Sequence, residues 1–161
     1  MHRELLPRFR LIAYDGEAQA SSQQNEKNHP GNAFRYQSTY PWASRAPMPQ
    51  KVWFHFRAKK RLAKIGFSTR KEKHPDHNPK EIRIIGSNEC DMDSPEVLLH
   101  VKDANFTAMN QARAWVIPES ASGAWYQCLG VEVMSIDGNG ITALQNMLMW
   151  EERVWYSDDP C

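Results

Sequence analysis

The sequence predicts an all-β fold, an antiparallel β-sandwich or jelly roll. Short apolar runs alternate with a period of two residues, which is the pattern of half-buried strands. Turn-forming residues separate these runs along most of the chain. Ten prolines, eight glycines and six tryptophans in 161 residues are more typical of a loop-rich β-protein than of a helix bundle. A chain of this length is expected to form one domain with a single core.

The strongest strand signal lies in residues 49–67, where two strands are expected with a short connection between them. Residues 57–61 are too charged to be buried and are expected to form that connection. Aromatic and β-branched residues on alternate positions define the faces of the first strand. One face holds Val52, Phe54 and Phe56, and the opposite face holds Trp53 and His55.

Shorter strands are expected along the rest of the chain, at residues 11–14, 81–86, 97–101, 114–117, 125–136 and 141–150. Two polar stretches, residues 15–31 and 68–80, are typical of loops. The composition of residues 143–150 also suits a helix. Its two-residue alternation and the tight turn predicted at residues 137–140 favour a strand instead.

Charge and hydropathy exclude several classes of partner. Lys and Arg total 20 and Asp and Glu total 19, so we expect no nucleic acid partner. No apolar run approaches the ~20 residues of a transmembrane helix, and the first residues lack the apolar core of a secretory signal. Three cysteines leave at least one unpaired, which favours an intracellular over a secreted protein. Cys90 and Cys128 would pair only if the fold brings them together, and a buried free Cys128 is the expectation.

Seven segments occur in an order that resembles a known family. They are residues 18–22, 40–44, 50–56, 65–70, 81–88, 128–133 and 143–150. Together they are similar to the discoidin-like domain, also called the coagulation factor 5/8 type C domain, within the galactose-binding-like jelly rolls. The resemblance implies a β-sandwich over residues 13–152, with an N-terminal arm at 1–12 and a C-terminal tail at 153–161.

The resemblance also implies a non-catalytic binding module. Members of this family bind glycans, phospholipid head groups or proteins through loops at one end of the barrel, and some hold calcium in an early loop. This chain has Phe34-Arg35 where members often have Asp-Gly. Because calcium needs carboxylate and carbonyl oxygens around it, we expect no metal and no cofactor.

Two loops, residues 35–42 and 70–78, form the candidate binding site, since the resemblance implies that they share one end of the barrel. An aromatic face beside Arg and His donors suits a sugar, whose C–H face stacks while its hydroxyls accept or donate hydrogen bonds. The candidate ligand-binding residues are Arg35, Tyr36, Tyr40, Trp42, Arg70 and His74. The alternative is that Tyr40 and Trp42 fill the end of the barrel and that the charges are solvated.

Other chemistry is less well supported by the sequence. His74, Asp76 and His77 are too few for a tetrahedral zinc site without a further ligand. The basic residues 57–64 and 70–73 are expected to form hydrated turns rather than a phosphate-binding surface. Motifs of catalytic nucleophiles and phosphate-binding loops are missing, so no enzyme activity is expected.

The sequence therefore predicts a module that binds glycans or cell-surface ligands through its barrel-end loops. The alternative is an intracellular scaffold subunit that binds proteins in a larger assembly, for example a ciliary or cytoskeletal one. In that alternative the ends of the chain dock on partners, because residues 1–10 carry Leu5, Leu6 and Phe9, and residues 151–161 carry Trp155 and Tyr156. The oligomeric state is not predicted.

Overall fold

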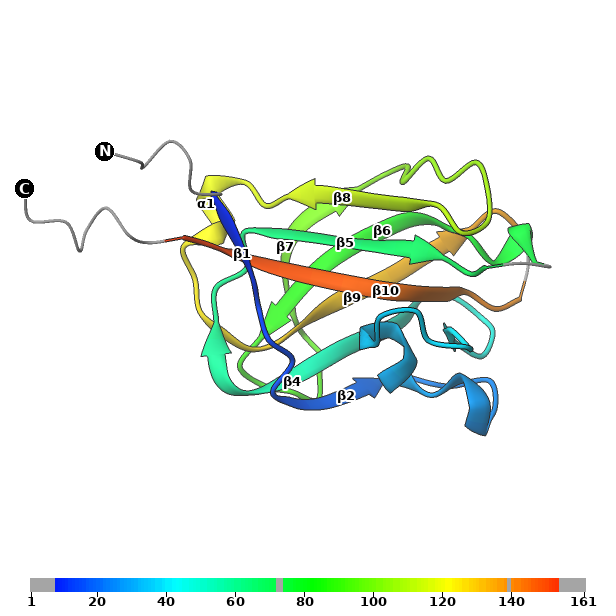
Figure 1. Cartoon of the computed structure of the whole chain (residues 1–161), viewed down its shortest axis with the longest axis horizontal. Coiled ribbons are helices and arrows are strands. Elements are labelled where there is room, and N and C mark those ends of the chain that lie inside the picture. Colours follow the sequence, from blue (N-terminus) through cyan, green and yellow to red (C-terminus); the bar gives the residue numbers. More distant parts are fainter. Residues whose placement is uncertain (1–7, 72–73, 139, 154–161) are drawn as a thin grey trace, which may run out of the picture.

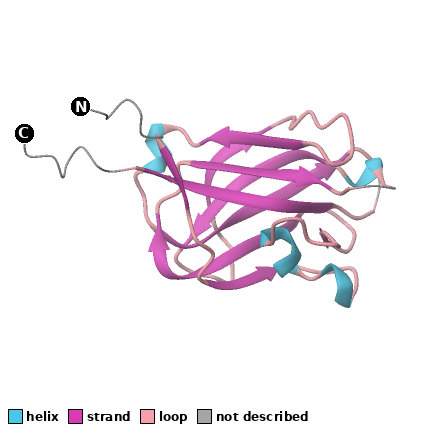
Figure 2. Cartoon of the chain, viewed as in Figure 1, coloured by secondary structure: helices cyan, strands magenta, loops and turns pink. Residues whose placement is uncertain are grey.

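A computed structural model describes residues 8–71, 74–138 and 140–153 of the chain. Within these residues, two antiparallel sheets of five strands each face one another across a shared core (Figure 1). Helical segments are short and lie in the connections between strands (Figure 2). The structure confirms the predicted all-β sandwich. None of the described helices is long and apolar enough to cross a membrane.

One sheet, the β10 sheet, has the strand order β1-β10-β5-β8, and β3 also pairs with β10. Its strands are β1 (Phe9–Leu11), β3 (Trp42–Ala43), β5 (Lys64–Thr69), β8 (Ala112–Val116) and β10 (Ala143–Glu152). The other sheet, the β9 sheet, has the order β2-β4-β9-β6-β7. Its strands are β2 (Gly16–Ala20), β4 (Gln50–Lys60), β6 (Pro79–Ser87), β7 (Glu96–Val101) and β9 (Tyr126–Ile136). The helical segments are η2 (Glu26–Asn28), η3 (Pro30–Phe34), η4 (Pro75–His77) and α1 (Glu119–Ser122).

The main core lies between the two sheets and uses the face of β4 that the alternation predicts. Val52 and Phe56 are fully buried and Phe54 is 5% exposed, all within the main cluster of core side chains. Phe54 packs on Phe56 with ring centroids 4.8 Å apart and on Phe34 at 5.3 Å. The predicted register of this strand is therefore confirmed.

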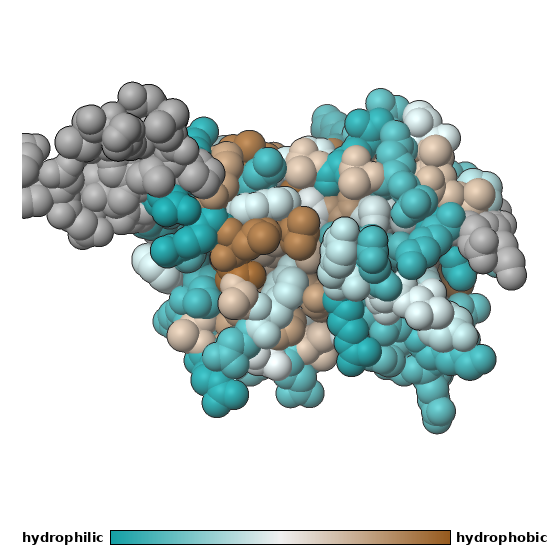
Figure 3. Space-filling view, viewed as in Figure 1, coloured by the Kyte–Doolittle hydropathy of each residue, from teal (hydrophilic) through white to brown (hydrophobic). Residues whose placement is uncertain are grey.

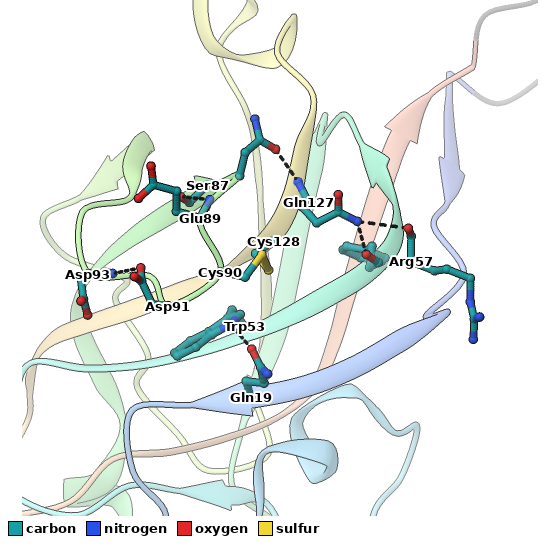
Figure 4. Close-up of a disulfide and its surroundings, with 12 residues drawn as sticks. Gln19, Trp53, Arg57, Ser87, Glu89, Cys90, Asp91, Asp93, Gln127 and Cys128 are labelled. Atoms are coloured by element: carbon teal, nitrogen blue, oxygen red, sulfur yellow. Dashed lines mark hydrogen bonds between the residues drawn. A yellow bond between two sulfur atoms is a disulfide. The ribbon is translucent and has the colours of Figure 1, made fainter.

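A second, smaller core covers the outer face of the β9 sheet and contains a disulfide. Trp53, Ile85, Met92 and Cys128 are buried there, with Cys90 packed against them. Cys90 and Cys128 are bonded with their Cα atoms 5.7 Å apart, and the Trp53 indole donates a hydrogen bond to Gln19 beside them (Figure 4). The expectation of a free Cys128 is wrong, because the loop after β6 returns Cys90 to β9.

Strand boundaries differ from the prediction in several places. The structure forms β2 inside the polar stretch 15–31, because five backbone pairs with β4 stabilise a segment whose residues have weak strand preference. The first strand, β1, covers Phe9–Leu11 and not residues 11–14. Residues 57–60 continue β4, with 57–59 exposed, instead of forming a turn.

The closing segment is the strand β10, as the alternation favours, and not a helix. A bulge between Gln145 and Leu148 interrupts its pairing with β5. Asn146 lies in this bulge with φ of 53°, a conformation that Asn tolerates better than most residues. Its side-chain oxygen accepts from the Gln37 N–H at 2.8 Å and its amide donates to Ser68 at 3.0 Å. The bulge thus connects β10 to β5 and to the loop after η3.

The described ends of the chain lie together at one end of the sandwich (Figure 1). β1 pairs with the last residues of β10, and the Arg153 N–H donates to the Arg8 carbonyl at 2.8 Å. Ion pairs join Arg8 to Glu152 at 3.0 Å and Arg10 to Glu151 at 2.8 Å. The apolar residues Leu5, Leu6, Trp155 and Tyr156, which the scaffold alternative invokes, lie outside the described residues.

Candidate functional site

The candidate site lies at the opposite end of the sandwich, where β5 ends and β6 begins (Figure 1). The connection, called loop 70–78 below, runs from Arg70 through η4 to Asn78, and its residues 72–73 are not described. β5 ends in the buried Thr69, so Arg70 is the first residue that emerges from the sheet. Pro75 begins the 3₁₀ turn of η4, which brings His74 and His77 onto the same side.

Arg70 and the two histidines form one cluster. The Arg70 Nη1 lies 3.1 Å from the His77 Nδ1, and the His74 and His77 rings stack with centroids 4.5 Å apart and planes 15° apart. His77 is 8% exposed, whereas His74 is exposed. Because a guanidinium can only donate, the His77 Nδ1 must accept, which assigns the proton of its neutral ring to Nε2.

The electrostatic surroundings also favour the neutral form of His77. Burial lowers the pKa of His77 below its ordinary value of 6.5, and electrostatic interactions with His74 and Arg70 lower it further. The Asp76 carboxylate acts in the opposite direction and does not outweigh burial. His77 is therefore a neutral hydrogen-bond acceptor at pH 7.

Neighbouring segments fix the backbone that carries these side chains. The Thr142 hydroxyl donates to the His77 carbonyl at 3.0 Å, and the Asp137 N–H donates to the Asn78 carbonyl at 3.2 Å. The Asn78 amide nitrogen donates to the Ala108 carbonyl at 3.3 Å.

The Asn78 Oδ1 is buried without a hydrogen-bond partner. A buried acceptor of this kind requires a donor from water or a ligand to be satisfied. Sequence reasoning did not select Asn78, and nothing in its sequence context distinguishes it from other loop amides.

Arg35, Tyr36 and Tyr40 are exposed on the loop after η3, with Tyr36 78% and Tyr40 44% exposed. Tyr36 lines a cavity of about 360 Å³ with residues 11–14, Phe34 and residues 146–149. The Lys27 ammonium lies 5.6 Å from the centroid of the Tyr40 ring. Neither Arg70 nor His74 lines that cavity.

Strand register separates these residues from loop 70–78. Leu144 of β10 pairs with Trp42 on one side and with Thr69 on the other, so β10 lies between β3 and β5. Two strand spacings correspond to a separation of about 10 Å across the sheet. β3 and β5 run in the same direction, so Tyr40 lies back along the sandwich while Arg70 lies beyond its end. Five of the six candidate residues therefore form two groups and not one.

Trp42 belongs to neither group, because it is fully buried in the core. Its indole Nε1 donates to the Ser22 carbonyl at 2.9 Å, and its backbone pairs with Leu144. Trp42 offers no ring face to a ligand, so its assignment as a binding residue is corrected. Its buried position agrees with the alternative from the sequence, in which the Trp42 indole fills the end of the barrel.

Two groups of side chains bring metal-binding atom types close together. His74, Asp76 and His77 have ligand atoms within 4.8 Å of one another, and so do His55, Cys90 and Cys128. In the first group the Arg70 guanidinium occupies the His77 Nδ1 lone pair and places a positive charge beside it. In the second group both sulfurs belong to the disulfide and provide no thiolate. Neither group is assigned as a metal site.

An apolar hollow of about 200 Å³ lies on the outer face of the β10 sheet. Gly66 lines this hollow, and a Cβ there would lie 2.8 Å from the Arg113 carbonyl oxygen and 2.9 Å from the Ala114 Cβ, so a side chain at this position would clash with β8. Leu148 and Trp150 form one wall, and the Lys64 ammonium lies 4.9 Å from the Trp150 ring centroid. Figure 3, which faces this sheet, shows apolar side chains gathered near its middle.

Comparison with solved structures identifies the architecture. An F5/8 type C domain from Bacteroides fragilis superposes with a TM-score of 0.73 at 8% identity, covering 91% of this chain and 99% of that domain. The chain has the discoidin-like fold. No model of a known family matches the sequence, and no curated protein matches it significantly.

Carbohydrate-binding modules share this discoidin-like fold. The family 32 module of NanJ from Clostridium perfringens, solved with galactose, gives a TM-score of 0.67 at 12% identity and covers 84% of this chain and 93% of that one. The family 32 module of AlyQ, solved with 4,5-unsaturated mannuronic acid, gives 0.65 at 12% identity and covers 86% and 97%. At such identities the similarity concerns the fold of the discoidin-like domain.

Proposed function

We propose that this discoidin-like domain is a non-catalytic glycan-binding module whose binding site is loop 70–78. The observation that carries the proposal is the cluster of Arg70, His77 and His74 at the end of the sandwich away from the described chain ends. Modules of the same fold that were solved with a neutral sugar and with an acidic sugar support it.

The chemistry of the cluster suits a sugar. Guanidinium N–H groups donate to hydroxyl or carboxylate oxygens, and a charged donor makes stronger hydrogen bonds than a neutral one. The exposed His74 ring adds a donor or an acceptor, depending on its tautomer. The buried Asn78 Oδ1 is an acceptor that a sugar hydroxyl could satisfy, directly or through a water.

The proposed site extends to Arg35, Tyr36 and Tyr40 only for a ligand longer than a monosaccharide. Since β10 separates them from Arg70 by about 10 Å across the sheet, a monosaccharide would contact one group and not both. An oligosaccharide that crosses the start of β10 would reach the exposed Tyr36 and Tyr40 rings, where its C–H faces could stack.

The scaffold alternative is not carried further. Its arguments were an odd number of cysteines and the apolar residues at the chain ends. Two of the three cysteines are paired, and disulfides are more typical of oxidising compartments. Phe9 lies in β1, and the other apolar end residues, Leu5, Leu6, Trp155 and Tyr156, lie outside the described part of the chain.

A glycan array tests the proposal with three proteins: wild type, Arg70→Ala and Arg57→Ala. Arg57 is the matched control, because it is an exposed arginine near the end of β4, where it pairs with Asp15 and lies outside loop 70–78. We expect wild type and Arg57→Ala to bind the same glycans, and Arg70→Ala to lose about tenfold or more in affinity, the effect of one charged hydrogen bond. Equal binding by Arg70→Ala would remove loop 70–78 as the site, and the absence of any bound glycan would contradict the function.

A further inference from the structure

Beside the disulfide on the outer face of the β9 sheet lies a third metal-binding group, the His55 imidazole. A ring nitrogen of His55 and the sulfurs of Cys90 and Cys128 all lie within 4.8 Å of one another. Within the described residues, the His55 side chain makes no hydrogen bond. The ring is half-buried, so one of its nitrogens has a lone pair available for a metal ion.

Strand pairing fixes two of these three groups. His55 of β4 lies directly opposite Cys128 of β9, so both side chains point to the same face of the sheet. Cys128 is fully buried, whereas Cys90 is partly exposed on the turn after β6. His55 and Cys128 are therefore held by the sheet, and Cys90 is the residue that can move when the disulfide opens (Figure 4).

Reduction of the disulfide turns this group into a set of zinc ligands. Two equivalents of a small thiol supply two electrons and two protons and become a disulfide themselves, which leaves one thiol on Cys90 and one on Cys128. Binding of Zn²⁺ then displaces one proton from each thiol to solvent, because the thiolate is the ligand. Tetrahedral Zn–S bonds of about 2.3 Å place two sulfurs about 3.8 Å apart. A small movement of the Cys90 turn provides this separation, since the three ligand atoms are already close together.

The surroundings provide a fourth position and an outer partner. A polar hollow of about 380 Å³ opens beside His55 and leaves room for a water as the fourth ligand. Glu17 of β2 lies opposite His55 and lines the same hollow. Its carboxylate suits the N–H of a metal-bound imidazole, which is usually held by such a group. Arg57 also lines the hollow, and its charge is paired with Asp15 at 3.3 Å.

We infer that His55, Cys90 and Cys128 form a zinc site when the disulfide is reduced. Two thiolates, one imidazole and an open position are a ligand set that suits Zn²⁺ and does not suit Ca²⁺ or Mg²⁺. With the disulfide formed, the set contains no thiolate and binds no zinc. The site lies on the outer face of the β9 sheet and not in loop 70–78, so the inference does not depend on glycan binding.

Metal titration of the full chain with Cys161→Ser tests the inference, because this substitution leaves the paired cysteines as the only thiol groups. The protein is reduced with dithiothreitol and desalted without oxygen. We expect it to bind one Zn²⁺ per chain, and to give the absorption bands of tetrahedral, thiolate-bound cobalt with Co²⁺. The oxidised protein should show neither property. A reduced protein without cobalt–thiolate absorption would overturn the inference.

The role of the imidazole is tested with His55→Ala in the same background. His100→Ala is the matched control, since His100 is an exposed histidine of β7 in the same sheet and pairs with Glu81. His55→Ala should weaken Zn²⁺ binding by more than the ~10–100-fold that loss of an outer partner costs, and His100→Ala should bind as the parent does. Equal binding by His55→Ala would show that the two cysteines bind zinc without His55, and the inferred site would be wrong.

Circular dichroism separates a missing site from a missing fold. If the reduced protein stays folded without metal, one equivalent of Zn²⁺ should raise its melting temperature by several degrees. If it unfolds, Zn²⁺ should restore the β signal, because metal binding then contributes to folding. The oxidised protein should not respond in either case. Zinc that changes neither the spectrum nor the melting temperature of the reduced protein would contradict the site.

Discussion

The disulfide between Cys90 and Cys128 is expected to contribute a large part of the stability of this domain. The two cysteines are 38 residues apart in the sequence. In the chain-entropy model, closing a loop of 38 residues lowers the entropy of the unfolded chain enough to stabilise the native state by about 4 kcal/mol. That is a substantial share of the ~5–15 kcal/mol by which native domains are stable.

Urea unfolding with and without dithiothreitol measures this contribution. We expect wild type to lose about 4 kcal/mol of unfolding free energy on reduction. The variant Cys161→Ser should lose the same amount, because Cys161 lies outside the pair. The double variant Cys90→Ala/Cys128→Ala should not respond to the reductant at all.

Thiol counting gives an independent check of the pairing. Because two of the three cysteines are bonded, one thiol per chain should react in denaturant before reduction and three after it. Three reactive thiols in freshly purified protein, or a stability unchanged by reductant, would refute the pairing and the stability argument based on it.

Three further outcomes are expected. Phe54→Ala should cost about 3–5 kcal/mol in urea unfolding, since Phe54 is buried between the sheets, and an unchanged midpoint would contradict its place in the core. Tyr14→Phe should cost about 1 kcal/mol, because the Tyr14 hydroxyl donates to the Met147 carbonyl at 2.5 Å in the β10 bulge; a more stable variant would show that this bond contributes nothing. Calcium should not change the melting temperature, since Phe34-Arg35 provides no carboxylate, and a rise of several degrees that a chelator reverses would disprove this.

Strand positions were predictable where side chains alternate and were not predictable where pairing alone creates the strand. The alternation of β4 and β10 identified both strands and the buried face of β4, because burial of one face selects that pattern. β2 has the sequence Gly-Glu-Ala-Gln-Ala, which has no such preference. It forms because the edge of β4 offers hydrogen bonds, and a single segment cannot reveal its partner.

The candidate site shows the same limit. Arg70 and His74 were selected as candidates because charged and imidazole side chains in a loop indicate binding, and their role stays a prediction. His77 was not selected, because its burial and its 3.1 Å contact with Arg70 are properties that sequence spacing does not contain. Trp42 was misassigned because an indole that stacks on a sugar and one that fills a core have the same sequence signature.

The pairing of β1 with the end of β10 has a mechanical consequence. Arg8 and Arg153 lie side by side, so a force that pulls them apart acts across the hydrogen bonds of these two antiparallel strands at one end. Such a force breaks the hydrogen bonds between β1 and β10 one after another, because it acts on the bond nearest the chain ends first and does not distribute over all of them. Because β1 has three residues, it should peel away at low force, while the disulfide and the proposed site at the far end keep their structure.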